Sequence, residues 1–443
     1  MNRQTTRLCT ILVVALVARS VLCWAAWNHL TELKKDERNY FTLAHSLLAG
    51  HGLGQETPDG YVPTSTRTPV YPVFLAFFCS LGGLIVPLLV QVMLSAGLSM
   101  AIYLFAVQLE RESVGLLAAL ILAIDPATVA GCLYHLTEVL YSVLLFTATA
   151  ILIWAHKKGN IFIYLLAGLA MGIATLCRPN TLYVWVWLIP WFLFSMRNIS
   201  IVSRFASYGI GFWLTAGLWY LRNYLVFGFF FFTSISSWNL YTYRAAWVEA
   251  RGADRPYAQV AEEFRSQIER ETHDLTNPIP SRVRLCTENS LRVFERYPVE
   301  TAVMLFDGAF RVLLSPSRPL IADLTGLSQG GLGLLSLDGS AAARILKAVQ
   351  QVTLIDFLLL LPDLFIFGLL YSGILYLAGW SIAHRHTSFP SGLMLWIALY
   401  LLISSAGPEA YARFRIPLTP FLAWCSAEGW MLIWHKLTRR SQT

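Results

Sequence analysis

The chain has 443 residues, of which 56% are hydrophobic and 13% charged, and its net charge is +7. So few charges cannot cover a soluble globule of this length, so most of the chain must lie in lipid. The basic excess is spread over short loops between apolar segments. Membrane orientation explains it, and it does not indicate nucleic-acid binding. The composition predicts an all-α polytopic membrane protein.

Ten apolar segments are candidates for transmembrane helices, because a bilayer core roughly 30 Å thick requires about 20 mostly apolar residues per span. They lie near 8–29, 83–107, 114–135, 138–156, 161–177, 181–196, 203–226, 352–380, 390–407 and 416–434. With the N-terminus in the cytoplasm, every short inner loop is basic, as the positive-inside rule requires. We therefore expect ten spans with both termini cytoplasmic. The first segment is expected to be an uncleaved helix, because no convincing cleavage site precedes Trp24.

The first outer loop, residues 30–82, opens with the acidic pair Asp36–Glu37. The pair begins an amphipathic helix that is predicted to end at Gly50 and to be followed by a turn-rich stretch. Residues 67–78 carry two prolines near their start, where proline is tolerated, and predict a second short helix at the membrane interface. Two interfacial helices would hold the acidic pair against the bundle, although an isolated Asp-Glu pair is more often solvated.

Three further charged residues fall at the outer ends of apolar segments, and each has a local explanation. Glu138 begins a helix, where a carboxylate complements the helix dipole, although Thr137 is an alternative cap. Arg178 ends an apolar helix just before Pro179. Arg222 lies at the outer end of its helix, where a cation is also favourable.

The last outer turn, residues 407–420, adds Glu409, Arg413 and Arg415. If the turn is helical, Glu409 and Arg413 form an i,i+4 pair, but Pro417 disfavours helix just before it. Burying so many ions at one interface is expensive without mutual pairing or a charged ligand. Because guanidinium groups match phosphate oxygens, the pattern favours a lipid-linked phosphate as substrate.

Residues 230–350 form the only candidate soluble domain, predicted to be mostly helical over 257–271 and 290–314. The Gly-rich segment 326–339 lacks the spacing of a phosphate loop and is interpreted as a flexible connection. The domain divides an N-terminal transmembrane region, 1–229, from a C-terminal one, 351–443. The seven cysteines make no disulfide framework or CxxC site, and neither a metal nor another cofactor is expected.

Several of these segments together resemble a known family, the GT-C type membrane glycosyltransferases that use polyprenyl-phosphate sugars. Protein O-mannosyltransferases and lipid A aminoarabinose transferases are members. The resemblance is carried by KDERNYFTLAHSLLAGHGL, TRTPVYPVFLA, YHLTEVLYSVLL, LCRPN, LWYLRNYLVFG and YARFRIPLTPFL, in that order and spacing. The chain departs from the family's tR.PgYP segment at Val70, which takes the glycine position. The domain 230–350 shows no usable resemblance, so the acceptor is not identified.

The resemblance implies that Asp36, with Glu37 beside it, lies at the reaction centre. Glu138 matches the family's acidic residue at the start of the fourth span. Arg222 and Arg413 match positions where basic residues contact the donor phosphate.

The residue types fit the transfer of a sugar from a lipid-linked donor to a hydroxyl or amine of a protein, lipid or glycan. A glycosyl phosphate already has a good leaving group, so the protein needs a base, predicted to be Asp36, and charges that stabilise the phosphate. Those charges are predicted to be Arg178, Arg222, Arg413 and Arg415. The sequence does not show whether burial raises the pKa of Asp36 more than the arginines lower it.

A transporter or flippase of a lipid-linked anion is the alternative, since it too would pair arginines with phosphate. Such proteins usually place their site near the midplane between repeats. This chain shows no repeat and its charges gather at the outer interface, so the transferase interpretation is favoured. We expect an integral protein of a bacterial inner membrane, with its site facing outside.

Overall fold

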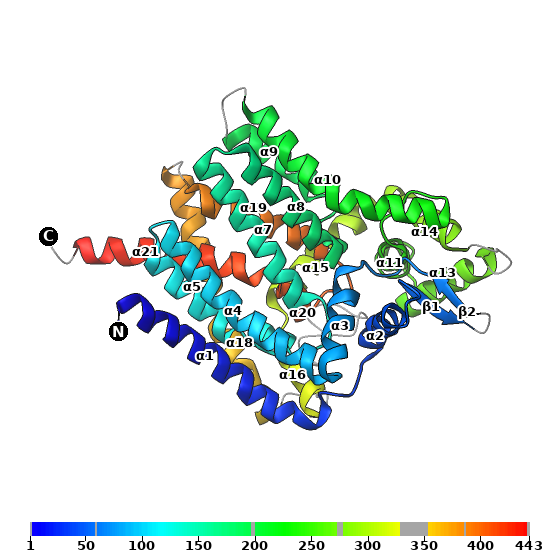
Figure 1. The fold of residues 1–443 in the computed structure, drawn as a ribbon, viewed down its shortest axis with the longest axis horizontal. Helices are drawn as coiled ribbons and strands as arrows, with labels where there is room; N and C mark the ends of the chain where they lie inside the picture. Colours follow the sequence, from blue (N-terminus) through cyan, green and yellow to red (C-terminus); the bar gives the residue numbers. More distant parts are fainter. Residues whose placement is uncertain are drawn as a thin grey trace.

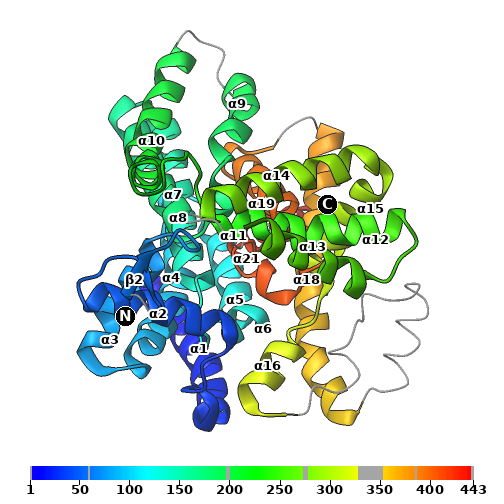
Figure 2. The same ribbon diagram turned by 90° about the vertical axis from the view of Figure 1, so that its right-hand side faces the viewer.

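The computed structural model describes residues 2–57, 60–195, 200–272, 278–327, 353–384 and 387–440, and these are mostly helical. The apolar helices form a bundle whose two chain termini lie at the same end, on the left of Figure 1. The opposite end carries a two-stranded hairpin and a group of more polar helices. Figure 2 views the molecule from that end and shows these helices lying across the ends of the apolar ones.

Helices occupy all ten ranges in which spans were predicted. They are α1 (Arg3–Ala26), α4 (Ile85–Gln108), α5 (Glu112–Ile124), α7 (Glu138–Lys158), α8 (Ile161–Cys177), α9 (Val184–Ser195), α10 (Ser200–Phe227), α18 (Leu354–His384), α19 (Phe389–Ser405) and α21 (Thr419–Arg440). By length and composition, four of them, α1, α4, α7 and α18, are long and apolar enough to cross a membrane. Shorter apolar helices include α5, α8 and α19. The chain is thus a membrane protein with a helical bundle, and the count of ten spans stays a prediction.

One predicted span differs from the structure. Residues 114–135 were expected to be a single helix, but α5 ends at Ile124 and a short helix, α6 (Pro126–Gly131), follows. Asp125 causes the break, because its carboxylate accepts hydrogen bonds from the backbone N–H and the hydroxyl of Thr128 at 2.8 and 2.7 Å. A capping aspartate followed by proline is a helix start, not a helix interior.

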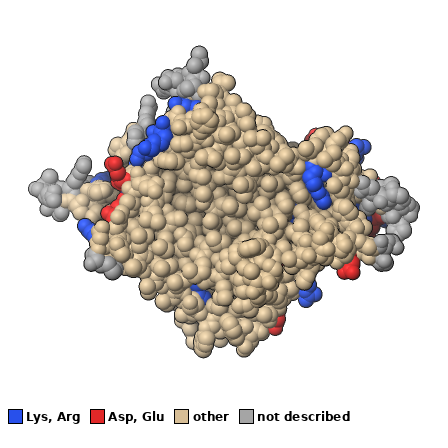
Figure 3. Space-filling model, viewed as in Figure 1, with Lys and Arg blue, Asp and Glu red and all other residues tan. Residues whose placement is uncertain are grey.

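Glycine allows a very close helix pairing in the bundle, that of α8 with α10. A Cβ added at Gly168 would lie 2.0 Å from the carbonyl oxygen of Tyr208, and one added at Gly211 would lie 2.1 Å from that of Leu165. Small residues let helices approach this closely within membranes, where packing replaces the hydrophobic effect. The broad face in Figure 3 is almost free of charge, with most Lys, Arg, Asp and Glu side chains toward its edges. A face with so few charged side chains fits contact with lipid.

The first loop contains both predicted helices. After a 3-10 turn, η1 (Trp27–His29), α2 spans Lys35–Leu48 and α3 spans Val70–Gly82. Between them the turn-rich stretch folds into an antiparallel hairpin of β1 (Gly54–Thr57) and β2 (Gly60–Pro63). α2 packs on α3, with the rings of Tyr40 and Tyr71 edge to face at 5.0 Å.

The helices between α10 and α18 are here called the helical domain. They are α11 (Ser234–Asn239), the π-helix η3 (Leu240–Ala245), α12 (Ala246–Gly252), α13 (Tyr257–Thr272), α14 (Pro278–Arg296), α15 (Pro298–Leu314) and α16 (Arg318–Thr325). The helices predicted for 257–271 and 290–314 are confirmed, the second being broken before Pro298. Nearly all of the Gly-rich segment 326–339 lies outside the described residues.

Candidate active site

A cavity of about 930 Å³ lies where the bundle meets the helical domain. Its walls come from α2, the segment after β2, the start of α7, the turn after α8, residues 230–244, α14, and the segment from the end of α19 to α20 (Ala412–Arg415). The turn after α8 contains the 3-10 helix η2 (Pro179–Thr181). The cavity therefore joins segments from both halves of the chain, and its lining includes both acidic and basic side chains.

Asp36 lies in the first turn of α2 and faces this cavity with its side chain 46% exposed. One carboxylate oxygen, Oδ1, lies 3.2 Å from Nη2 of Arg67. The other, Oδ2, lies 3.3 Å from Nη2 of Arg413. Arg67 also lies over the ring of Tyr40, 4.8 Å from its centroid. Asp36 is thus held by two arginines and remains accessible to a ligand.

Glu138 continues the same series of charges at the start of α7. Its Oε1 accepts a hydrogen bond from Nη1 of Arg178 at 2.6 Å and lies 3.1 Å from Nε of Arg413. Its Oε2 is buried and has no hydrogen-bond partner. Thr137, the alternative cap, makes no side-chain capping bond and instead accepts from Arg178 at 3.3 Å.

These contacts form one row of alternating charges, Arg67–Asp36–Arg413–Glu138–Arg178, here called the charge row. Three guanidinium groups meet two carboxylates, so the row carries one excess positive charge. A phosphodiester carries one negative charge and would neutralise it. Mutual pairing also offsets the desolvation of these ions, which the sequence left as an open problem.

The pKa of Asp36 is decided by competition between burial and charge. Burial raises the pKa of this carboxyl, but Arg67 and Arg413 lower it more, so its pKa lies below the usual value. The carboxylate is therefore ionised at neutral pH and able to accept a proton, although the arginines make it a weak base.

Glu37 points away from the cavity. Its side chain is buried, with Oε2 accepting from the backbone N–H of Lys34 at 2.6 Å and Oε1 accepting from that of His135 at 2.7 Å. The first bond caps α2, and the second ties α2 to the segment before α7. The structure thus separates the acidic pair: Glu37 anchors the helix, and Asp36 is placed in the cavity.

Arg222, predicted to bind the donor phosphate, is not among the residues that line the cavity. Its guanidinium donates to the carbonyl oxygens of Thr64 at 3.0 Å and of Leu53 at 3.5 Å, and to the side chain of Asn223. These bonds tie the end of α10 to the segments that flank the hairpin. Its role as a phosphate contact stays a prediction that this geometry does not favour.

Arg415 is also away from the cavity, although Arg413 is only two residues before it. Its side chain is fully buried and donates to the carbonyl oxygens of Leu313 and Ser315 at 3.2 and 2.8 Å. It also pairs with Asp363 of α18 at 3.4 Å. Arg413 and Arg415 thus have different partners, although only one residue separates them in α20: Arg413 contacts Asp36 and Glu138, and Arg415 contacts Asp363.

Arg244 is a charged residue of the cavity that the sequence gave no reason to choose. It lies in η3 and donates to Glu409 Oε1 and to the carbonyl oxygen of Ser404, both at 3.0 Å. Glu409 therefore pairs with the helical domain instead of forming the i,i+4 pair with Arg413. Residues 408–411 are not helical, so that register does not arise. A π-helical turn is an uncommon feature that often marks functional sites.

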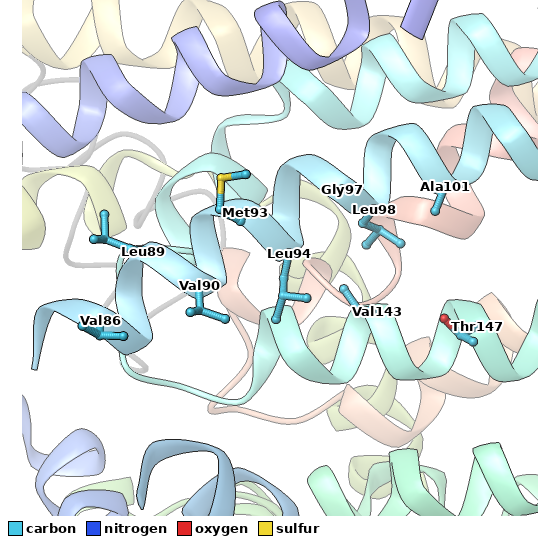
Figure 4. Close-up of a pocket in the computed structure, with 10 residues that line it drawn as sticks. All are labelled: Val86, Leu89, Val90, Met93, Leu94, Gly97, Leu98, Ala101, Val143 and Thr147. Carbon is cyan, nitrogen blue, oxygen red and sulfur yellow. The ribbon is translucent and has the colours of Figure 1, made fainter. Parts of the chain in front are cut away.

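A second hollow, about 400 Å³ in volume, lies between α4 and α7 and is lined by apolar side chains and Thr147 (Figure 4). From Glu138, helix geometry places Val143 about 140° and Thr147 about 180° around α7. The hollow therefore opens on the side of α7 opposite the charge row. It belongs to the apolar surface of the bundle and not to the cavity.

Among the residues that the structure describes, no group of three or more His, Cys, Asp or Glu side chains is arranged to hold a metal ion. The charged lining of the cavity is dominated by arginine–carboxylate pairs. These can hold an anion and accept a proton.

Comparison with known proteins gives a family match over part of the chain. Residues 66–220 match the family described as dolichyl-phosphate-mannose-protein mannosyltransferase. This segment contains Arg67, Glu138 and Arg178 of the charge row. No curated protein sequence matches the chain.

Solved structures with the same fold include an archaeal oligosaccharyltransferase, AglB from Archaeoglobus fulgidus, in complex with an inhibitory peptide and a dolichol-phosphate. It is 16% identical, with a TM-score of 0.57 over 98% of this chain and 51% of that chain. An Archaeoglobus fulgidus oligosaccharyltransferase tethered to an acceptor peptide gives 14% identity and a TM-score of 0.56 over 97% of this chain and 50% of that chain. The chain thus spans about half the length of these structures.

ArnT from Cupriavidus metallidurans bound to undecaprenyl phosphate also matches, at 14% identity over 95% of this chain and 77% of that chain, with a TM-score of 0.44. The resemblance inferred from the sequence is confirmed. The chain has the fold of the GT-C type membrane glycosyltransferases, and residues 66–220 are similar to the mannosyltransferase family.

Proposed function

We propose that this protein transfers a sugar from a polyprenyl-phosphate donor to an acceptor hydroxyl or amine in the 930 Å³ cavity. The charge row supports the proposal most directly, because it places an accessible carboxylate beside guanidinium groups with one excess positive charge. The family match and the GT-C fold support the same class of reaction.

In the proposed reaction, the acceptor oxygen or nitrogen attacks the anomeric carbon and forms the new glycosidic bond. The bond from that carbon to the phosphate oxygen breaks, and its electron pair leaves with the polyprenyl phosphate. Asp36 takes the proton that the acceptor loses. General-base assistance of this kind typically contributes about a hundredfold to ten-thousandfold in rate.

The arginines are proposed to stabilise the negative charge that develops on the leaving phosphate. Arg413 and Arg178 were predicted for this role, and Arg67 joins them because it faces Asp36 from the other side. A phosphate oxygen that displaced Asp36 from Arg413 would also release the carboxylate from one cation. Donor binding would then raise the pKa of Asp36 and make it a stronger base.

We further propose that the cavity faces the outside of a bacterial inner membrane, with residues 230–350 as the outer domain. The basic short loops support this orientation. The helical domain forms one wall of the cavity through residues such as Trp238, Tyr243 and Arg244. The acceptor would enter along this wall.

The proposal is tested with purified protein in liposomes, an envelope extract from a deletion strain as acceptor, and radiolabelled sugars on different carriers. We expect label to pass to the extract from a polyprenyl-phosphate sugar. The Asp36→Asn protein is the negative control and should transfer almost no label. Efficient transfer from a nucleotide sugar without lipid carrier would overturn the donor assignment. Movement of intact lipid-linked sugar across the liposome membrane without transfer would favour a flippase.

A further inference from the structure

Helix α15 has apolar side chains on both its buried and its exposed face, which is unexpected for a helix of a soluble domain. One face is buried through Met304, Gly308 and Val312. The other exposes Val299, Phe306, Phe310 and Leu314, with exposed fractions of 68, 70, 59 and 48%. Spacings of seven, four and four residues place these side chains in one stripe along the helix. A continuous exposed apolar surface of this kind marks an interaction site.

The middle of α15 lies at the level where the apolar helix α19 ends. A Cβ added at Gly308 would lie 2.2 Å from the backbone nitrogen of Gly407 and 3.0 Å from Cα of Ala406. These residues come directly after α19, which ends at Ser405. The middle of α15 therefore packs against the cavity end of α19.

The C-terminal end of α15 lies deeper. Its Leu313 carbonyl accepts hydrogen bonds from Tyr371 of α18 and from Arg415. Tyr371 lies 13 residues (384 − 371) before His384, the last residue of α18, which corresponds to about 20 Å along a helix. Leu313 therefore contacts the interior of α18 and not its end. The side chains of Phe365 and Leu375 near it are 63 and 71% exposed, so this part of α18 has an apolar outer surface.

We infer that α15 is an interfacial helix whose apolar stripe is seated in the lipid bilayer. Gly308 packs where α19 ends, and Leu313 accepts a hydrogen bond from Tyr371 within α18, so the stripe lies at and below the level at which the apolar helix α19 ends. Asp307 and Arg311 pair with each other at 2.8 Å beside the stripe, which offsets the cost of placing these two charges near lipid. A 17-residue helix is about 25 Å long, which suits a helix lying along the interface.

This arrangement gives the bilayer a part in building the cavity. α15 contacts the start of the turn 406–411 through Gly308, and Arg415 of α20 holds its C-terminal carbonyls. The same turn and helix carry Glu409 and Arg413 into the cavity. Lipid under α15 would therefore support the position of α20.

Lipid contact can be mapped with a phospholipid that carries a photoreactive diazirine in its acyl chain. The full-length protein is reconstituted with this lipid, illuminated, digested and analysed by mass spectrometry. We expect adducts at Phe306 and Phe310 at a level comparable with those at Phe365 and Leu375 of α18. Leu291 of α14 is the matched control, since it is 52% exposed but lies beside exposed charged residues, and it should carry at least tenfold less label.

Two results would overturn the inference. One is equal labelling of Leu291 and Phe306, and the other is absence of label at Phe306 when α18 is labelled. A Phe306→Cys protein, treated with a short thiol crosslinker, tests the alternative that a second copy of the chain covers the stripe. Efficient crosslinking between two copies without lipid adducts would assign the stripe to a protein interface. The mapping needs no turnover, so its failure is distinct from failure of the proposed transfer reaction.

Discussion

Arg413 donates a hydrogen bond of 3.3 Å to Asp36, although 377 residues separate them in the chain. The contact joins the first loop to the segment before the last apolar helix, and both residues line the cavity. Because Arg413 also pairs with Glu138 at 3.1 Å, one guanidinium organises both carboxylates of the charge row. Loss of this side chain would leave two acidic groups facing each other with reduced compensation.

Asp36→Asn is expected to abolish nearly all transfer while the protein stays folded in the membrane. The amide keeps the shape of the carboxylate but cannot take a proton from the acceptor, which corresponds to a loss of about a hundredfold to ten-thousandfold. The rate is measured in the liposome assay at saturating donor. Glu32→Gln removes an acidic group from the same loop at an exposed position and is the control. Near-normal turnover of the Asp36→Asn protein would exclude this base.

Arg67→Gln is expected to move the acidic limb of the pH profile of kcat/KM to higher pH. Arg67 and Arg413 lower the pKa of Asp36 against the effect of burial, so removing one of them lets that pKa rise. Asp36 is active as the carboxylate, so activity falls as pH drops through its pKa, and a higher pKa means an earlier fall. Arg38→Gln removes an exposed arginine from α2, the helix that carries Asp36, and should leave the acidic limb in place. An unmoved limb in the Arg67→Gln protein would mean that another group controls it.

The sequence allowed four members of the charge row to be proposed, Asp36, Glu138, Arg178 and Arg413, because each flanks an apolar segment at the same interface. It did not show which way neighbouring side chains point. Glu37 and Arg415 each lie within two residues of a cavity residue, yet both satisfy backbone groups elsewhere.

Arg244 could not be predicted because it depends on tertiary folding. It lies in a segment without resemblance or periodic signal, and only the packing of η3 on the bundle brings it to Glu409. The helix break at Asp125 was readable in principle from an aspartate followed by proline. The apolar run around it concealed this capping signal.

Glu37→Gln is expected to lower stability more than chemistry. Both carboxylate oxygens accept backbone N–H groups, and the amide would turn its own N–H₂ toward one of them. An unsatisfied buried group of this kind costs about 1–3 kcal/mol, which should appear as a lower Tm in detergent. The donor KM of the remaining folded protein should be unchanged. A normal Tm with lost turnover would instead return Glu37 to the reaction centre.

Residues 230–350 are expected to face the outside, with the short basic loops inside. Cys286 is buried, so introduced cysteines are the better probes. Glu295→Cys on α14 should react with an impermeant maleimide in intact cells, and Lys158→Cys at the end of α7 should react only after the membrane is opened. Both positions are exposed. The reverse pattern would contradict the orientation and the outward-facing cavity.

Arg413→Lys is expected to raise the KM for the lipid-linked donor more than the KM for the acceptor. Lysine restores the positive charge, but it lacks the planar fork that contacts Asp36 and Glu138 here and that would match two phosphate oxygens in the complex. Arg413→Ala should weaken donor use further. Arg222→Lys is the matched comparison, because Arg222 lies at the same end of the bundle but donates to the carbonyl oxygens of Thr64 and Leu53.

The comparison separates phosphate binding from support of the fold. If Arg222 acts by tying α10 to the first loop, its substitution should lower Tm with little change in the ratio of the two KM values. Arg413→Lys should instead change that ratio severalfold at an unchanged Tm. Equal effects of both substitutions on donor KM would restore Arg222 as a phosphate contact. A donor KM unaffected by Arg413→Ala would remove Arg413 from the donor site, since its guanidinium would then serve only to pair two carboxylates.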